Sequence, residues 1–241
     1  MVKIFCVVIP LLFLVDVHTF AQARKIKKEV QTEYVPDGQG QLQSDTVETI
    51  KLYDKKGNVV EEIEKSFLPM ANKIVSYSKK NFYNTRGRYD STLTFVDGKF
   101  ALKWELHYDS GNREIMAQEI NSERKPGFRS QNIYSANSKQ KSRTEMYDPE
   151  GKLYNFKNYK YDKKGNVVDE SGSEGGEPRY RWLSKYDKKN RLTEREDYSG
   201  QGVLLRKHKY EYDKDGRMSQ ETVLDAQGQL EKVVKYSYEY Y

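Results

Sequence analysis

The segment Tyr161-Asp162-Lys163-Lys164-Gly165-Asn166-Val167 occurs twice in this chain of 241 residues, because Tyr53 to Val59 matches it in all seven positions. Variants of the same segment begin at Tyr147, Tyr186 and Tyr212. A repeat of this kind has to be interpreted before any other feature, because it describes the architecture of the chain. It recurs for reasons of folding, so it does not identify an activity.

Each position of the repeat is typical of a hairpin turn. Asp at the first turn position favours a type I turn, where its side chain accepts a hydrogen bond from a backbone N–H two residues later. Gly57, Gly165 and Gly216 stand where this class of hairpin needs a left-handed residue and forms a bulge. Asn190 replaces glycine once, and asparagine tolerates that conformation. The repeat therefore predicts antiparallel hairpins.

The spacing of the turns predicts strands of roughly 7 to 9 residues, because turn signals recur about every 11 to 14 residues. Between the turns, apolar and polar residues alternate, as in His208, Tyr210 and Tyr212 against Lys207, Lys209 and Glu211. In residues 64–92 and 117–145 the alternation is too irregular to assign residues to the two faces of a strand. Ser122 to Ser142 is polar and is interpreted as a long loop or as irregular strands.

The segment Tyr212 to Met218, with Tyr210 before it, resembles the YD repeat of Rhs-type proteins, and the clearest repeats cover residues 147–230. MORN-like hairpin repeats are a second choice. The resemblance implies an all-β, elongated, coiled antiparallel sheet, which in large Rhs proteins forms a shell around a toxic domain. This chain is too short to enclose such a domain, so the shell function is not carried over. A remnant or accessory of an Rhs-type toxin system stays an alternative.

Residues 1–23 are predicted to be a secretory signal peptide. Lys3 precedes an apolar run from Ile4 to Val15, and Ala21-Gln22-Ala23 offers a small-x-small cleavage pattern. The run is shorter than the roughly 20 residues of a spanning helix. Cleavage would remove Cys6, the one cysteine, and leave residues 24–241 as a single β-hairpin repeat domain without disulfides. We expect a periplasmic, outer-surface or secreted protein, with no membrane span after cleavage.

The composition indicates a thin core, because the chain is highly charged but contains 20 tyrosines and 9 phenylalanines. Tyrosine rings can bury apolar area while their hydroxyls stay hydrated. The net charge of +6 comes from residues of both signs mixed along the chain. This mixing favours a solvated surface over a nucleic-acid patch, so no nucleic-acid partner is predicted.

The sequence offers no catalytic, cofactor-binding or metal-binding motif. His107 and His208 are interpreted as surface strand positions, and Asp213-Lys214-Asp215-Gly216 as a turn rather than a calcium loop. The candidate binding surface consists of aromatic residues, namely Trp104, Trp182, Tyr236, Tyr238 and Tyr240, although core positions are the favoured interpretation of both tryptophans.

Two functional hypotheses follow. The first is an exported, non-enzymatic β-repeat protein that presents a sheet surface to an envelope protein or a polysaccharide. The second is a carbohydrate hydrolase that uses paired carboxylates on the sheet face. A cleft with two carboxyl groups about 5–10 Å apart would favour the second hypothesis.

Overall fold

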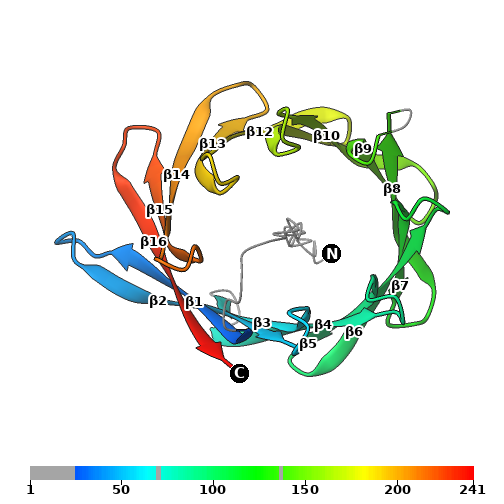
Figure 1. The fold of residues 1–241 in the computed structure, drawn as a ribbon, viewed down its shortest axis with the longest axis horizontal. Helices are drawn as coiled ribbons and strands as arrows, with labels where there is room; N and C mark the ends of the chain where they lie inside the picture. Colours follow the sequence, from blue (N-terminus) through cyan, green and yellow to red (C-terminus); the bar gives the residue numbers. More distant parts are fainter. Residues whose placement is uncertain (1–24, 69–71, 136–137) are drawn as a thin grey trace.

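The chain forms a closed antiparallel β-barrel of sixteen strands in a computed structural model that describes residues 25–68, 72–135 and 138–241 (Figure 1). The strands follow one another around the ring in sequence order, and β1 pairs with β16 to close it. The strands are β1 (Ile26–Pro36), β2 (Leu42–Tyr53), β3 (Val59–Leu68), β4 (Lys73–Tyr83), β5 (Tyr89–Val96), β6 (Lys99–Tyr108), β7 (Glu114–Asn121), β8 (Pro126–Tyr134), β9 (Lys141–Tyr147), β10 (Leu153–Tyr161), β11 (Val167–Glu174), β12 (Glu177–Tyr186), β13 (Leu192–Ser199), β14 (Leu204–Tyr212), β15 (Met218–Asp225) and β16 (Leu230–Tyr240). No described residue belongs to a helix that is long and apolar enough to cross a membrane.

The closure corrects the predicted fold. The prediction of an all-β antiparallel fold is confirmed. The prediction of an elongated coiled sheet is wrong, because β1 and β16, which would be its two edges, pair with each other through eight residue pairs from Ile26↔Tyr240 to Tyr34↔Val233. Ser122 to Ser142 is not a long loop, since it contains β8 and the start of β9. The predicted signal peptide lies outside the described residues.

The turns have the predicted chemistry. In the turn at Asp54, the Gly57 N–H donates to the Asp54 carbonyl at 3.0 Å, and the Asp54 Oδ1 accepts from the N–H groups of Lys56 and Asn58. Gly57 has a φ of 92° and Asn190 a φ of 61°, so both occupy the left-handed position. The turns that follow even-numbered strands form one mouth of the barrel, which we call mouth A. The turns that follow odd-numbered strands form mouth B.

A ladder of tyrosines links each hairpin to the previous one at mouth A. In each even-numbered strand from β4 to β16, a tyrosine at or near the end of the strand donates its hydroxyl hydrogen to the carbonyl of the first residue of the odd-numbered strand before it, at 2.6–3.0 Å. The seven donors are Tyr83, Tyr108, Tyr134, Tyr161, Tyr186, Tyr212 and Tyr238. Burial raises the pKa of Tyr161 and Tyr212 to about 12, so these hydroxyls stay protonated and can donate. The tyrosine of the repeat therefore joins neighbouring hairpins.

The arginine of the repeat makes two contacts. The Arg191 Nε pairs with the Asp187 carboxylate of its own turn at 2.7 Å, while the guanidinium lies 4.6 Å from the ring centre of Tyr212 in the next ladder position. Arg113 makes the same contacts with Asp109 and Tyr134. The tyrosine, aspartate, glycine and arginine of the motif thus each make a contact within the barrel.

Replacing Asn84 by aspartate is expected to stabilise the protein by about 1 kcal/mol. Arg88 lies over the Tyr108 ring like its equivalents, but its turn begins with Asn84 and its buried Nε and Nη1 have no hydrogen-bond partner. A carboxylate at position 84 would supply that partner. Urea unfolding should show the gain for N84D. N121D, in a mouth B turn without this arginine, is the control, and an equal gain there would contradict the explanation.

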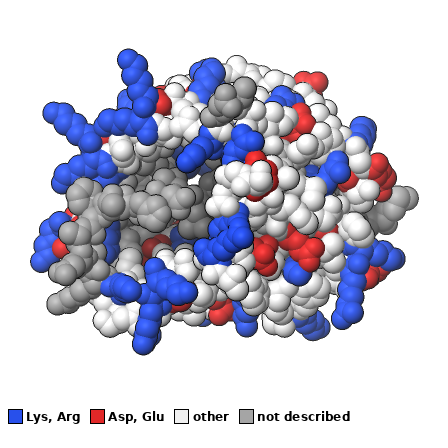
Figure 2. Space-filling view, turned by 45° about the vertical axis from the view of Figure 1, so that its right-hand side comes forward, with Lys and Arg blue, Asp and Glu red and all other residues white. Residues whose placement is uncertain are grey.

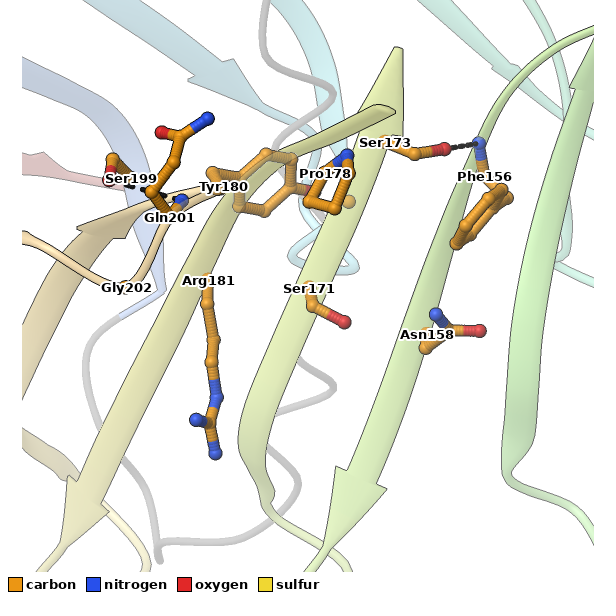
Figure 3. Close-up of a pocket in the computed structure, with 12 residues that line it drawn as sticks. Phe156, Asn158, Ser171, Ser173, Pro178, Tyr180, Arg181, Ser199, Gln201 and Gly202 are labelled. Atoms are coloured by element: carbon orange, nitrogen blue, oxygen red, sulfur yellow. Dashed lines mark hydrogen bonds between the residues drawn. The ribbon is translucent and has the colours of Figure 1, made fainter. Parts of the chain in front are cut away.

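The wall has two polar faces, and neither is a continuous apolar surface. Cross-strand pairing places Trp104, Glu170, Trp182, Asp197 and His208 on one face, which we call the inner face. The other, outer face carries Lys160, Arg181 and Lys185 among other charged residues. Figure 3 views the wall with the far strands of the ring behind it, and Arg181 lies beside Ser171 of the neighbouring strand.

Exposure differs between these faces in the way that curvature requires, because side chains converge inside a barrel and spread apart outside it. The Lys160 side chain is 76 % exposed and that of Lys185 is 68 % exposed, whereas that of His208 is 7 % exposed. Val223, also on the inner face, is fully buried. The core is thin, as the composition predicted, and much of it lies along the inner face, although Val233 on the outer face is buried as well.

Candidate functional site

A groove on the outer face lies where β10, β11 and β12 approach mouth B (Figure 3). Its volume is about 450 Å³. The residues that shape it come from these strands and from the turn after β13, and the principal ones are Phe156, Asn158, Ser171, Pro178, Arg181 and Gln201. The segment Ser171 to Gly176 has the composition of a turn, but β11 continues to Glu174 and only Gly175 and Gly176 remain between the strands.

Small residues create the groove. β11 contributes Ser171-Gly172-Ser173, so the surface over β11 is recessed between the larger side chains of β10 and β12. On the inner face behind the groove, Gly172 lies opposite Tyr180, and a Cβ atom at position 172 would overlap the Tyr180 ring. The side of the groove near mouth B is closed by the turn at Gly200, where a Cβ atom would overlap the Pro178 carbonyl.

Replacing Gly200 by alanine is expected to destabilise the barrel by about 1–3 kcal/mol, because the overlapping atoms belong to the backbone of β12 and cannot turn aside like a side chain. Thermal unfolding would measure the loss. Gly38→Ala is the matched control, since no atom lies within 4 Å of the added Cβ and Gly38 has no positive φ. A similar loss in both variants would contradict the packing explanation.

Several polar groups of the groove already have partners. The Ser173 hydroxyl accepts from the Phe156 N–H at 3.2 Å, and the Arg181 guanidinium donates to both oxygens of Asp169 at 3.0 and 2.9 Å. The Gln201 backbone N–H donates to the Ser199 hydroxyl at 3.3 Å. The Ser171 hydroxyl and the side-chain NH₂ groups of Gln201 and Asn158 donate to no group within the described part of the chain. The groove therefore offers uncharged donors and acceptors beside the apolar surfaces of Phe156 and Pro178.

A second cluster lies on the inner face of β13, β14 and β15. His208 is buried between two carboxylates, with its Nδ1 2.7 Å from Glu221 and its Nε2 3.0 Å from Asp197. The Arg195 guanidinium donates to Asp197 at 2.7 and 3.2 Å and also lies over the Trp182 ring. The Tyr236 hydroxyl reaches Glu221 at 3.5 Å. We call Arg195, Asp197, His208 and Glu221 the His208 cluster.

The contacts within the His208 cluster favour the charged form of each titratable group in it. Burial alone would lower the pKa of His208, but the hydrogen bonds that its ring donates to Asp197 and Glu221 outweigh burial and raise that pKa. Burial would raise the pKa of both carboxyl groups, but His208 and Arg195 lower it below the usual value. The cluster thus holds two carboxylates and two cations in contact.

The stability of the barrel is expected to fall as the pH rises through the folded-state pKa of His208. A raised folded pKa means that the stabilising contribution is complete below the unfolded value of about 6.5 and is lost above the folded value. Asp197 and Glu221, whose pKa values are lowered, contribute above their unfolded values and lose their contribution as the pH falls. Unfolding free energies across the pH range should show the alkaline loss in the wild type. H208Q should lack it, and an unchanged profile in H208Q would contradict the assignment.

The five aromatic residues predicted from the sequence share the inner face, but the structure does not gather them at one place. Trp104 on β6 is separated from Trp182 on β12 by the five strands β7–β11, and the three tyrosines lie on β16. Trp182 and Tyr236 meet opposite ends of the His208 cluster. Tyr238 belongs to the tyrosine ladder, and Tyr240 lies under Arg217. Neither tryptophan is fully buried. The set stays a prediction.

Sequence reasoning placed His208 on the surface, and that interpretation is wrong. Only 6 % of His208 is exposed, whereas His107 is exposed as expected. The alternation around His208 was visible in the sequence, but its partners on β13 and β15 follow from the register of three strands. The groove was also missed, because its small residues had been assigned to a turn. Within the described residues, no group of three or more His, Cys, Asp or Glu side chains is arranged to hold a metal ion.

No protein-family model matches this chain, and no curated protein matches it in sequence. Its structure is similar to that of a porin-like protein from Bacteroides uniformis, with a TM-score of 0.60 and 9 % identity over 89 % of this chain and 98 % of that chain. At this identity the similarity concerns the fold alone.

Two further structures match more weakly. They are a DUF1329 family protein from Desulfovibrio piger, with a TM-score of 0.35, 10 % identity and coverage of 89 % and 86 %, and a LolA superfamily protein from Nitrosomonas europaea, with a TM-score of 0.32, 15 % identity and coverage of 90 % and 86 %. TM-scores this low do not indicate that either structure shares the fold of this chain. The closed barrel and its match to the porin-like fold overturn the resemblance to YD-repeat proteins, and the MORN-like alternative with it.

Proposed function

We propose that this protein is an exported, non-enzymatic binding protein of the cell envelope, and that the groove on β10–β12 holds a neutral carbohydrate. The observation that carries the proposal is the composition of the groove. Ser171, Asn158 and Gln201 present uncharged hydrogen-bonding groups next to Phe156 and Pro178. Binding sites for small polar molecules combine apolar walls with a few placed polar groups in this way.

Charge supports a neutral ligand. The one guanidinium that lines the groove, that of Arg181, is held by two hydrogen bonds to Asp169. A charged ligand would have to compete with this bidentate pair, whose geometry makes it one of the stronger types of ion pair. A sugar needs no such competition, because its hydroxyl groups can use the serine hydroxyl and the two amides.

The carboxyl groups support a binding role over hydrolysis. A glycosidase needs an acid whose pKa is raised, beside a second carboxylate. Asp197 and Glu221 both have lowered pKa values and are held by His208. Burial raises the pKa of Glu119, but its cross-strand neighbour on β6 is Trp104, and it lies over Gly127 of β8. Neither neighbour supplies a second carboxylate.

The outer face supports a position in aqueous surroundings. Barrels that span a membrane present an apolar band to lipid. Here the outer face carries ion pairs at widely separated places around the ring: Lys28–Glu239 between β1 and β16, Lys103–Glu105 within β6, and Lys185–Glu194 between β12 and β13. Together with the signal peptide predicted for residues 1–23, these pairs favour a periplasmic or secreted protein over a pore.

A glycan array followed by calorimetry on the best neutral oligosaccharide tests the proposal. Ser171→Tyr fills the groove from an outward-facing position and is expected to abolish binding. Ser237→Tyr, at an exposed outward position on β16, is the matched control and should bind like the wild type. A blank array, or equal binding by the two variants, would overturn the proposal. Binding of an envelope protein in place of a glycan would also overturn the assignment of ligand.

A further inference from the structure

Cations gather at mouth A, although charges of both signs are mixed along the sequence. The described turns after the even-numbered strands contain thirteen basic residues, namely Lys55, Lys56, Arg86, Arg88, Arg113, Lys139, Lys163, Lys164, Lys188, Lys189, Arg191, Lys214 and Arg217. They contain six acidic residues, namely Asp54, Asp109, Asp162, Asp187, Asp213 and Asp215. The mixing of charges along the sequence is therefore not preserved at this end of the barrel.

Mouth B has the opposite balance. The described turns after the odd-numbered strands contain three basic residues, Arg124, Lys125 and Lys152, and five acidic residues, Asp37, Asp97, Glu123, Asp148 and Glu150. The cause is the repeat itself. The three Tyr-Asp-Lys-Lys turns follow β2, β10 and β12, which are all even-numbered strands, so all three fall at mouth A of this up-and-down barrel. The variant at Tyr147 follows β9 at mouth B, and it has Pro149 and Glu150 in place of the two lysines. In Figure 2 an opening of the barrel is bordered by blue side chains, while the wall mixes blue and red.

The cations at the tips of these turns are available to a partner. The carboxylates at the start of each turn are occupied by their own backbone, as Asp162 accepts from the N–H groups of Lys164 and Asn166. Nine basic residues of mouth A are exposed and have no ion-pair partner within the described residues: Lys55, Lys56, Arg86, Lys139, Lys163, Lys164, Lys188, Lys189 and Lys214. The arginines that follow the turns, such as Arg191, are instead held by aspartate and tyrosine.

The arrangement of these cations selects the shape of the partner. They occupy the tips of turns spread around the ring from the β2–β3 turn to the β14–β15 turn. Cations around an open circle cannot converge on one small anion. They do not form a single track that would follow a nucleic-acid strand either. A flat surface with many anions can contact all of them together.

We propose that mouth A docks the barrel, end on, onto an anionic phospholipid surface. The lysines contact lipid phosphates, and the strands stand away from the bilayer. Basic residues close to an anionic leaflet are attracted individually, and the attraction decays within a Debye length. The groove on β10–β12 opens near mouth B, so the docked protein keeps that groove away from the membrane. The proposal does not depend on what the groove binds.

The test is co-sedimentation of the mature protein with vesicles of phosphatidylcholine alone or mixed with phosphatidylglycerol. The protein is expected to bind only the mixed vesicles and to be released as the salt concentration rises. A variant with Lys55, Lys56, Lys188 and Lys189 all changed to Gln should bind at least about tenfold more weakly. These residues lie at turn positions that make few demands on the side chain, so the barrel should keep its circular dichroism spectrum.

A second variant separates local docking from net charge. It has Lys80, Lys185, Lys209 and Lys235 of the outer wall changed to Gln, which removes the same charge, and it should bind almost like the wild type. S171Y should also bind vesicles normally. Equal losses in the two lysine variants would overturn the proposal, as would binding to phosphatidylcholine alone. Binding of double-stranded DNA as tightly as the mixed vesicles would replace the membrane surface with a soluble polyanion.

Discussion

Replacing Glu221 by alanine is expected to destabilise the barrel by about 3–5 kcal/mol, the usual cost of breaking a buried ion pair. Glu221 accepts from the Nδ1 of His208 at 2.7 Å, and the two side chains are 17 % and 7 % exposed. The truncation leaves a protonated histidine next to Arg195 with one carboxylate fewer. Urea unfolding followed by the fluorescence of Trp182, which lies against Arg195, would measure the loss.

Glu196 provides the control for this prediction. It lies on the outer face, 3.7 Å from Lys207, and its partner is 45 % exposed. Glu196→Ala should therefore cost at most about 1 kcal/mol. A Glu221→Leu, His208→Leu double variant should recover much of the loss, because it removes both buried charges together. Equal costs for E221A and E196A would show that the His208 cluster is not a buried electrostatic unit.

Deleting residues 26–36 is expected to abolish the monomeric barrel. The deletion removes β1 and leaves fifteen strands, with β2 and β16 as the new edges. Two even-numbered strands run in the same direction, so they cannot reproduce the antiparallel ladders that β1 makes with both of them. Unpaired edges also promote association between chains. Size-exclusion chromatography with light scattering should show oligomers or aggregates.

Deleting residues 114–140 is the matched control. It removes two strands and joins Arg113 to Lys141, which begins β9 as Glu114 begins β7. The direction of every remaining strand is preserved, so a smaller monomeric barrel with reduced stability is expected. A folded monomer from the single-strand deletion, or aggregation of both variants alike, would contradict the argument from strand direction.

The sequence predicted the features that depend on neighbouring residues. Asp54 and Gly57 act within one turn, so their roles follow from local backbone chemistry and are confirmed. The alternation of His208 and Tyr210 with Lys207 and Lys209 likewise appears as buried and exposed positions. A turn and the alternating residues beside it are thus enough to define a hairpin without reference to the rest of the chain.

Features that depend on distant pairing were not predictable. The same alternation suits an open coiled sheet and a closed barrel, and the decision rests on β1 meeting β16, as in the pair of Glu29 and Tyr238 more than 200 residues apart. The partners of His208 depend on the register of β13 and β15. The groove depends on Ser171 and Gly172 being in a strand, and their composition resembles a loop.

The tyrosine ladder gives the barrel a direction of assembly. Each hydroxyl reaches back to a carbonyl that was synthesised about 20 residues earlier, as Tyr186 reaches Val167 and Tyr212 reaches Leu192. A chain that enters a new compartment with its N-terminus first can therefore add each hairpin to one that has already formed. β1 must wait for β16 before its second edge is covered, so we expect ring closure to be the last and slowest event of folding.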